Sequence, residues 1–334
     1  MVKYFTNRNV NIFLFLVAII LPLVTDNQYL LHIFSLTFIW SIAVYGLNLI
    51  GGFTGQLSLA HAGFFGIGAY AVGLLTVKAG LNFWLALLLG IIITTFIGFL
   101  IGLVALRTKE HFFAIYTLCV GYIIYLVIYK WEDLTEGVRG LIGIPAPAPI
   151  GPITFDTPRN QYYLLLFFLV FVIFLMHRIM NSIVGKTYIA IRNSEELAET
   201  IGIATMKQKM VSFVLSTFFA GLSGGLYAAF VRFIGPDISY INVTFDMLTY
   251  LIVGGIGTIS GPLIGTLIIV WLSQYLQFLQ NYRMLIFGPL LALLIIFYPR
   301  GIAGGYHIWR AKRMMKKSQT VMQSSVHSAV EEER

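Results

Sequence analysis

The 334-residue sequence contains few charged residues and a single cysteine. Asp, Glu, Lys and Arg make up 11% of the chain, whereas soluble proteins usually contain about a quarter. This composition excludes an ordinary water-soluble domain, and the 58% share of hydrophobic residues indicates an integral membrane protein. Cys119 lies in an apolar stretch, so the sequence contains neither a disulfide framework nor a thiol metal site.

Ionisable residues are also scarce at the centres of the apolar segments, where His32, His61 and Asp246 come nearest to being exceptions. Transporters driven by protons or ions usually keep such residues at membrane depth. Gly185-Lys186-Thr187 resembles the end of a phosphate-binding loop, but Met180 stands where that loop requires its first glycine. Because zinc spacings and nucleophile constellations are lacking too, we expect no enzyme activity, no bound cofactor and no metal in this chain.

Apolar segments fill most of the chain, and most of them approach the roughly 20 residues that a helix needs to cross a bilayer. The segment at 245–257 is barely long enough to cross and could be re-entrant. We predict an all-α polytopic bundle of about ten transmembrane helices in residues 1–310, followed by a polar cytoplasmic tail at 311–334. The ten segments lie near residues 10–25, 29–50, 57–77, 83–106, 112–129, 161–177, 210–231, 245–257, 262–280 and 284–299.

Lys and Arg distribute unequally between the connections. If the chain crosses ten times, sixteen of the 22 fall on the side that holds both termini, which the positive-inside rule places in the cytoplasm. The net charge of +8 does not indicate nucleic-acid binding, because the cations flank apolar spans or cluster after residue 309, as is typical of contact with lipid headgroups. The six on the opposite side are Lys78, Lys130, Arg139, Arg159, Arg232 and Arg283.

Two hydrophilic connections stand out. The external connection at about 130–160 is rich in proline, which favours an extended chain, and it is either a solvated connector or a docking surface for an external protein. The cytoplasmic connection contains a short acidic helix at about 193–202. Asn193 and Glu196 have the spacing of a capping box, and Gly202 can end the helix.

That acidic helix is too short to be stable alone in water. Ser194, Leu197, Ala198 and Ile201 have the spacing of one apolar face, with Glu195, Glu196 and Glu199 mainly elsewhere. It either rests on lipid headgroups or packs on a protein. Its carboxylates would be repelled by an anionic membrane surface, which favours a protein partner.

Four polar residues lie at membrane depth and need hydrogen-bond partners there. Asn48, Gln56, Ser58 and His61 either line a translocation path or pair with one another across helices; Ser58 and His61 are three apart, so on a helix they would share a face. Small residues that recur every fourth position mark close helix packing or moving faces. These pairs are Gly98 with Gly102, Gly221 with Gly225, and Gly261 with Gly265.

The acidic helix contains a recognisable motif. Glu196-Leu197-Ala198-Glu199-Thr200-Ile201-Gly202 is similar to the coupling motif of bacterial ABC importer permeases, although Leu197 replaces its first alanine. Four further distinctive stretches lie at 55–70, 190–193, 220–228 and 254–265. Together, these motifs resemble the branched-chain amino-acid permease family, particularly its longer, second-type subunit, and the resemblance extends from about Asn48 to Gly301.

The resemblance implies a subunit in the bacterial cell membrane that pairs with a second, related permease. It also implies two cytoplasmic ATP-binding subunits, which hydrolyse ATP, and an extracytoplasmic substrate-binding protein. The coupling residues would then be Arg192, Glu195, Glu196, Ala198, Glu199 and Gly202.

Two alternatives stay open from the sequence. Relatives with these motifs import urea or short amides, so the cargo is less certain than the type of transporter. An ion-driven secondary transporter or a channel is the alternative from another class, and a dependence of uptake on ATP would separate it from the importer.

Overall fold

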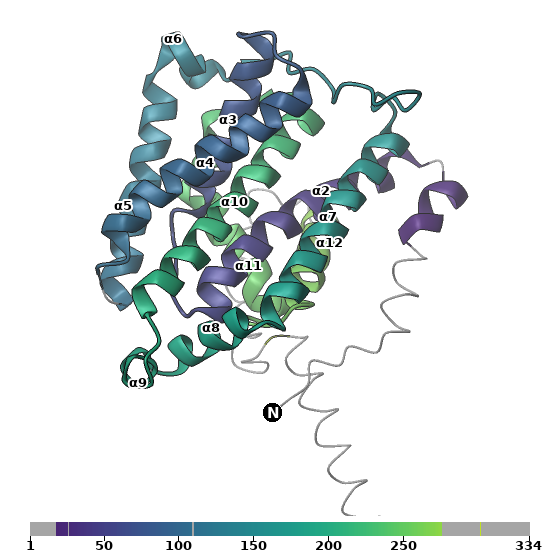
Figure 1. The fold of residues 1–334 in the computed structure, drawn as a ribbon. Coiled ribbons are helices and arrows are strands. Elements are labelled where there is room, and N and C mark those ends of the chain that lie inside the picture. The colour runs from purple at the N-terminus through teal and green to yellow at the C-terminus, as the bar shows by residue number, and fades with distance from the viewer. Residues whose placement is uncertain (1–17, 26, 109, 276–300, 302–334) are drawn as a thin grey trace, which may run out of the picture.

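The computed structural model describes residues 18–25, 27–108, 110–275 and 301 (Figure 1). The predicted span at 284–299 and the tail at 311–334 lie outside the described residues. In the described part, long helices run between two ends of a bundle, which confirms the all-α class. One end carries the short helix α6, and the opposite end carries α8 and α9 (Figure 1).

Among the described residues, five helices are long and apolar enough to cross a membrane. Three further apolar helices are shorter, so the predicted count of about ten crossings stays a prediction. The long helices are α2 (Gln28–Leu47) with its π-helical extension η1 (Asn48–Phe53), α4 (Phe83–Ala105), α5 (Glu110–Lys130), α7 (Pro158–Met180) and α10 (Thr205–Val231). The shorter ones are α3 (His61–Val77), α11 (Ile241–Gly254) and α12 (Gly261–Tyr275).

Polar residues set where several of these helices begin. The side chain of Asn27 accepts hydrogen bonds from the backbone N–H groups of Tyr29 and Leu30, and Asn82 accepts one from Trp84. Such caps satisfy backbone N–H donors that the first turn of a helix leaves without a partner.

α11, which contains most of the predicted segment at 245–257, has 14 residues. It is therefore only about 21 Å long, short of the roughly 30 Å hydrocarbon layer.

α10 is the central helix, and it packs against α2, α3 and α4. Glycines allow this close approach. A Cβ at Gly98 or Gly102 of α4 would overlap Thr217 or Phe213 of α10, and one at Gly221 or Gly225 of α10 would overlap Thr94 or Leu87 of α4. On α12, Gly261 and Gly265 lie in the same way against the backbone of the α11 segment. The helix backbones thus lie too close for larger residues, as in membrane bundles generally.

Connections that the sequence placed outside meet at the α6 end. α6 (Glu132–Thr135), η2 (Gly137–Arg139) and strand β1 (Leu141–Ile142) follow α5. β1 pairs antiparallel with β2 (Phe233–Ile234), which follows α10 and precedes η3 (Pro236–Ser239). The expectation of an extended chain at 130–160 is therefore wrong at its start, where Thr135 donates hydrogen bonds to the carbonyls of Ile128 and Trp131 and stabilises the turn of α6.

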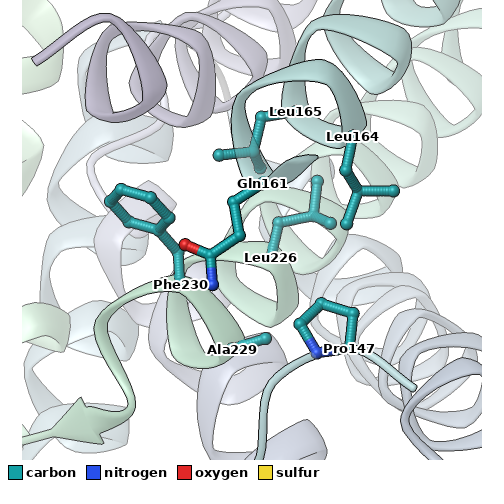
Figure 2. Close-up of a pocket in the computed structure, with 7 residues that line it drawn as sticks. All are labelled: Pro147, Gln161, Leu164, Leu165, Leu226, Ala229 and Phe230. Atoms are coloured by element: carbon teal, nitrogen blue, oxygen red, sulfur yellow. The ribbon is translucent and has the colours of Figure 1, made fainter. Parts of the chain in front are cut away.

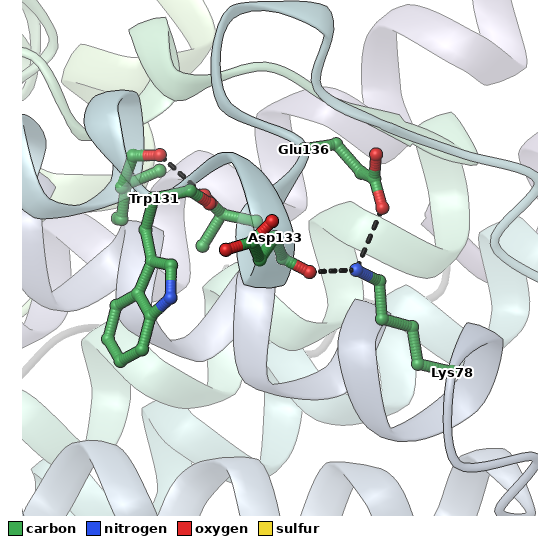
Figure 3. A network of polar contacts seen from close by, with 6 residues as sticks. Lys78, Trp131, Asp133 and Glu136 are labelled. Atoms are coloured by element: carbon green, nitrogen blue, oxygen red, sulfur yellow. Dashed lines mark hydrogen bonds and ion pairs between the residues drawn. The ribbon is translucent and has the colours of Figure 1, made fainter.

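A surface network joins α3 to this external connection (Figure 3). The Lys78 ammonium lies 2.7 Å from the Glu136 carboxylate and donates to the Asp133 carbonyl at 2.8 Å. The hydrogen bond and the charge of Lys78 lower the pKa of Glu136. Both side chains are about a third or more exposed, at 36% and 41%, so water screens this pair.

Candidate functional site

Two short helices at the end of the bundle opposite α6 form the first part of the candidate site. α8 (Ile183–Asn193) and α9 (Glu195–Thr200) connect α7 to α10 (Figure 1). Ser194 separates them in an extended conformation, and its hydroxyl accepts the Leu197 N–H at 3.2 Å. The predicted Asn193 cap is therefore wrong, because α8 continues through Asn193 and Ser194 takes the capping position.

Two acidic residues anchor α9 to α10. Glu195 pairs with Lys209 of α10 at 2.5 Å, and Glu199 accepts a hydrogen bond from Thr205 at 2.7 Å. Ala198 is 1% exposed, whereas Leu197 and Ile201 are 66% and 69% exposed. Of the predicted apolar face, Ala198 is therefore buried against the bundle, while Leu197 and Ile201 stay exposed.

The surface that α9 leaves open combines apolar and acidic groups. Leu197, Ile201 and Glu196 are all exposed on it. Gly202 follows with a backbone φ of +84°, a conformation that favours glycine, and its N–H donates to the Glu199 carbonyl at 2.9 Å. We call Glu196, Leu197 and Ile201 the α9 surface.

An interrupted helix forms the second part of the site. α2 ends in η1, residues 54–60 are not helical, and α3 begins only at His61. Non-helical backbone at membrane depth is tolerated where protein buries it or water lines it. Here the hydroxyl of Thr117 accepts the Leu59 N–H of this segment, and the hydroxyl of Thr244 accepts the Ala62 N–H in the first turn of α3.

The four polar residues predicted for a translocation path all lie around this interruption, and all are buried. Asn48 accepts the Gly257 N–H at 2.9 Å and donates to the Thr258 carbonyl at 2.8 Å. His61 makes a 2.8 Å hydrogen bond with the Ala43 carbonyl. These two side chains therefore hold backbone in place within the described structure.

Gln56 and Ser58 differ from the other two. The Gln56 Oε1 and the Ser58 hydroxyl are buried, and the described residues offer neither of them a hydrogen-bond partner. The expectation that Ser58 shares a helix face with His61 is wrong, because Ser58 precedes the helix. The reason is the turn at Gly55, where φ is +83° and the helical ladder stops.

Several residues of this region were missed by sequence reasoning. Thr54 and Ser212 join η1 to α10 through a 2.7 Å hydrogen bond between their hydroxyls, and both are buried. Lys209 is 4% exposed although it lies near a helix end. Of these three residues, only Lys209 could have been identified from the sequence. An apolar segment follows it directly, so its charge needs a partner if the side chain is buried.

A small pocket lies away from both parts of the site (Figure 2). Pro147 of the external connection, Gln161 and Leu165 of α7, and Phe230 of α10 contribute to its lining. The side-chain amide of Gln161 donates to the Phe155 carbonyl at 2.9 Å. None of the predicted path residues is among the residues that line this pocket.

The fold and the site define an α-helical membrane protein with interrupted helices and a short helical unit that protrudes at one end. Residues 29–297 match the family described as branched-chain amino acid transport system / permease component. The chain belongs to this family of permeases.

Curated relatives support the assignment. The high-affinity branched-chain amino acid transport system permease protein LivM of Escherichia coli is 28% identical over 86% of this chain and 74% of its own length. LivM of Salmonella typhimurium is 28% identical over 80% of this chain and 68% of its own. LivH of Salmonella typhimurium, a permease protein of the same kind of system, is 24% identical over 79% of this chain and 91% of its own length. No solved structure matches the chain.

Proposed function

We propose that this chain is the transmembrane permease subunit of an ATP-driven ABC importer for branched-chain amino acids. The family supports a permease, and the names of the LivM and LivH relatives support this cargo over urea or short amides. The match to both LivM and LivH supports pairing with a second, related permease. The chain itself binds no cofactor, and two cytoplasmic partner subunits hydrolyse ATP.

The exposed α9 surface is the observation that carries the proposal. A six-residue helix is unstable alone, yet α9 is fastened to α10 at both ends, through Glu195–Lys209 and Glu199–Thr205. This anchoring leaves Leu197 and Ile201 in solvent beside Glu196. Apolar anchors with a charged rim suit a protein groove, whereas anionic lipid would repel the carboxylate.

In the proposed cycle, an extracytoplasmic binding protein delivers the amino acid at the α6 end. The partner subunits close on ATP at the α8–α9 end and displace α9. Both termini then lie in the cytoplasm, and the permease lies in the bacterial cell membrane. As candidates for the translocation path we favour Gln56 and Ser58 over Asn48 and His61. The Gln56 Oε1 and the Ser58 hydroxyl have no hydrogen-bond partner in the described part of the chain.

Replacement of Glu196 tests this function. We expect Glu196→Lys to abolish ATP-dependent leucine uptake into vesicles, because the reversed charge opposes the partner groove, while membrane insertion stays intact. Glu196→Gln keeps the shape of the side chain and should retain most uptake. Lys207→Glu is the matched control, since it reverses an exposed charge at the same end outside the α9 surface. Wild-type uptake by Glu196→Lys would contradict the role of α9.

A further inference from the structure

Two interruptions of the helical bundle, far apart in sequence, lie side by side. One is η1 with the non-helical residues 54–60, and the other is the turn at 255–260 between α11 and α12. Asn48, which is fully buried, bridges them through both its amide donor and its acceptor. Displacement of either interruption therefore strains or breaks its bonds to the other.

Gly52 and Gly257 make this approach possible. A Cβ at Gly52 would overlap the Asn48 side chain and come within 2.7 Å of the Gly257 nitrogen. Gly257 has a φ of +72° and faces the Gly52 carbonyl, which its own Cβ would meet at 2.9 Å. By contrast, a Cβ at neighbouring Gly51 would make only ordinary contacts, at 3.9 Å or more.

Arg192 joins this double interruption to the α8–α9 unit. Its guanidinium Nη1 donates to the Gly52 carbonyl at 2.6 Å and lies directly against Gly257. Its aliphatic stem lies over Gly55, where a Cβ would come within 3.1 Å of Cγ. Arg192 stands two residues before Ser194, the extended residue between α8 and α9. The side chain therefore lies at the junction between the α8–α9 unit and the double interruption.

A second connection runs through α10. Lys209 and Thr205 hold α9, and Ser212 of the same helix contacts Thr54 and the Leu49 carbonyl. α10 packs against α2, α3 and α4, whereas α8 contacts η1, α7, α9 and α10 at the end of the bundle. The connection through α8 differs because Arg192 contacts both interruptions, at Gly52 and at Gly257, whereas the hydrogen bonds of Ser212 go to Thr54 and the Leu49 carbonyl.

We propose that Arg192 is the positioning residue that transmits displacement of α9 to both interruptions at once, through the Gly52 carbonyl and Gly257. In this arrangement Asn48 keeps the two interruptions moving together, and the path segment at 54–60 opens only when α8 moves. The inference rests on the proposed function, because partner subunits supply the displacement.

The test uses the complete transporter in proteoliposomes, with the second permease, the ATP-binding subunits and the binding protein. Leucine uptake and ATP hydrolysis are measured together, and hydrogen exchange is followed in peptides covering 48–60 and 255–260 with and without a non-hydrolysable ATP analogue. We expect Arg192→Ala to keep ATP hydrolysis within about twofold while uptake per ATP falls about tenfold, a typical size for coupling between sites. The nucleotide-dependent change in exchange should disappear from both peptides together.

Four further variants control for folding. Arg192→Lys keeps a cation and a donor, and should recover part of the coupling. Gly52→Ala should lower uptake per ATP because its Cβ forces the interruptions apart, whereas Gly51→Ala should behave as wild type. Lys207→Ala removes an exposed cation at the same end and should leave coupling unchanged.

The outcomes separate this inference from the proposed function. Wild-type coupling and wild-type nucleotide-dependent exchange in Arg192→Ala would overturn the inference, while ATP-dependent uptake by the unmodified complex would still support the importer. Equal losses in Gly51→Ala and Gly52→Ala would also overturn it. Leucine accumulation by the unmodified complex without ATP would overturn the proposed function, and the inference with it.

Discussion

The two ends of the bundle hold ion pairs of similar length in different surroundings. At the α8–α9 end, Lys209 and Glu195 are 2.5 Å apart and their side chains are 4% and 32% exposed. At the α6 end, Lys78 and Glu136 are 2.7 Å apart and 36% and 41% exposed. The difference in burial shows that contact distance alone does not indicate what an ion pair contributes.

Burial changes the consequence of breaking a pair. An ammonium removed from water needs its partner, so loss of one member leaves an uncompensated charge. An exposed pair is solvated on both sides and contributes little. The Lys209–Glu195 pair should therefore contribute more to stability than the exposed Lys78–Glu136 pair.

The largest effect is expected at the buried end. Glu195→Ala leaves the Lys209 ammonium buried without its carboxylate, which should cost about 3 kcal/mol of unfolding free energy, the lower end for a buried pair because Glu195 is partly exposed. Unfolding of the purified protein in detergent measures this loss. Glu196→Ala, which removes the adjacent exposed acid, is the control. Equal stability of the two variants would show that the anchor does not behave as a buried pair.

A smaller effect should appear in partner binding rather than in stability. Leu197 is 66% exposed, so Leu197→Ala should leave the unfolding transition unchanged. It should weaken binding of the ATP-binding subunits about tenfold if Leu197 is an interface anchor. Binding to the purified permease pair measures this, with Val138→Ala as the control, since Val138 is a similarly exposed apolar residue at the α6 end. Destabilisation without loss of binding would contradict the assignment of the α9 surface.

The smallest effect is expected at the exposed end, and it should depend on pH. Because Lys78 lowers the pKa of Glu136 in the folded state, the pair stabilises the fold above the ordinary carboxyl pKa of 4.5. That contribution is lost as the pH falls through the lowered pKa. Lys78→Ala should therefore shift the thermal midpoint slightly near neutral pH, and the shift should become smaller as the pH falls below 4.5. The comparison between the two ends would be contradicted if Lys78→Ala shifted the thermal midpoint as much as Glu195→Ala does. It would also be contradicted if the shift grew as the pH falls.

The sequence predicted most membrane helices because hydrophobic length is a local property. α4, α5 and α7 lie within a few residues of their predicted ranges. The segments at 57–77 and 245–257 were less accurate, because tertiary contacts decide where their helices begin. Thr117, far along the chain, holds the non-helical Leu59, and so α3 starts at His61.

The contacts of the candidate site could not be predicted from the sequence. Glu195, Glu199 and Arg192 stay predicted coupling residues, and their partners Lys209, Thr205 and Gly52 could not be read from spacing. The bond between Asn48 and the Gly257 N–H joins residues 209 positions apart. The Asn193 cap failed for a more local reason, since Asn193 and Ser194 are both good caps and only the course of α8 decides between them.

The central claim is that the bundle is driven from its α8–α9 end by partner subunits. It is tested most directly by leucine accumulation in two sets of vesicles, one with the complete transporter and ATP and one with the permease chains alone. The account predicts accumulation against a gradient in the first set and none in the second, with or without a proton gradient. Accumulation by the permease chains alone would contradict it.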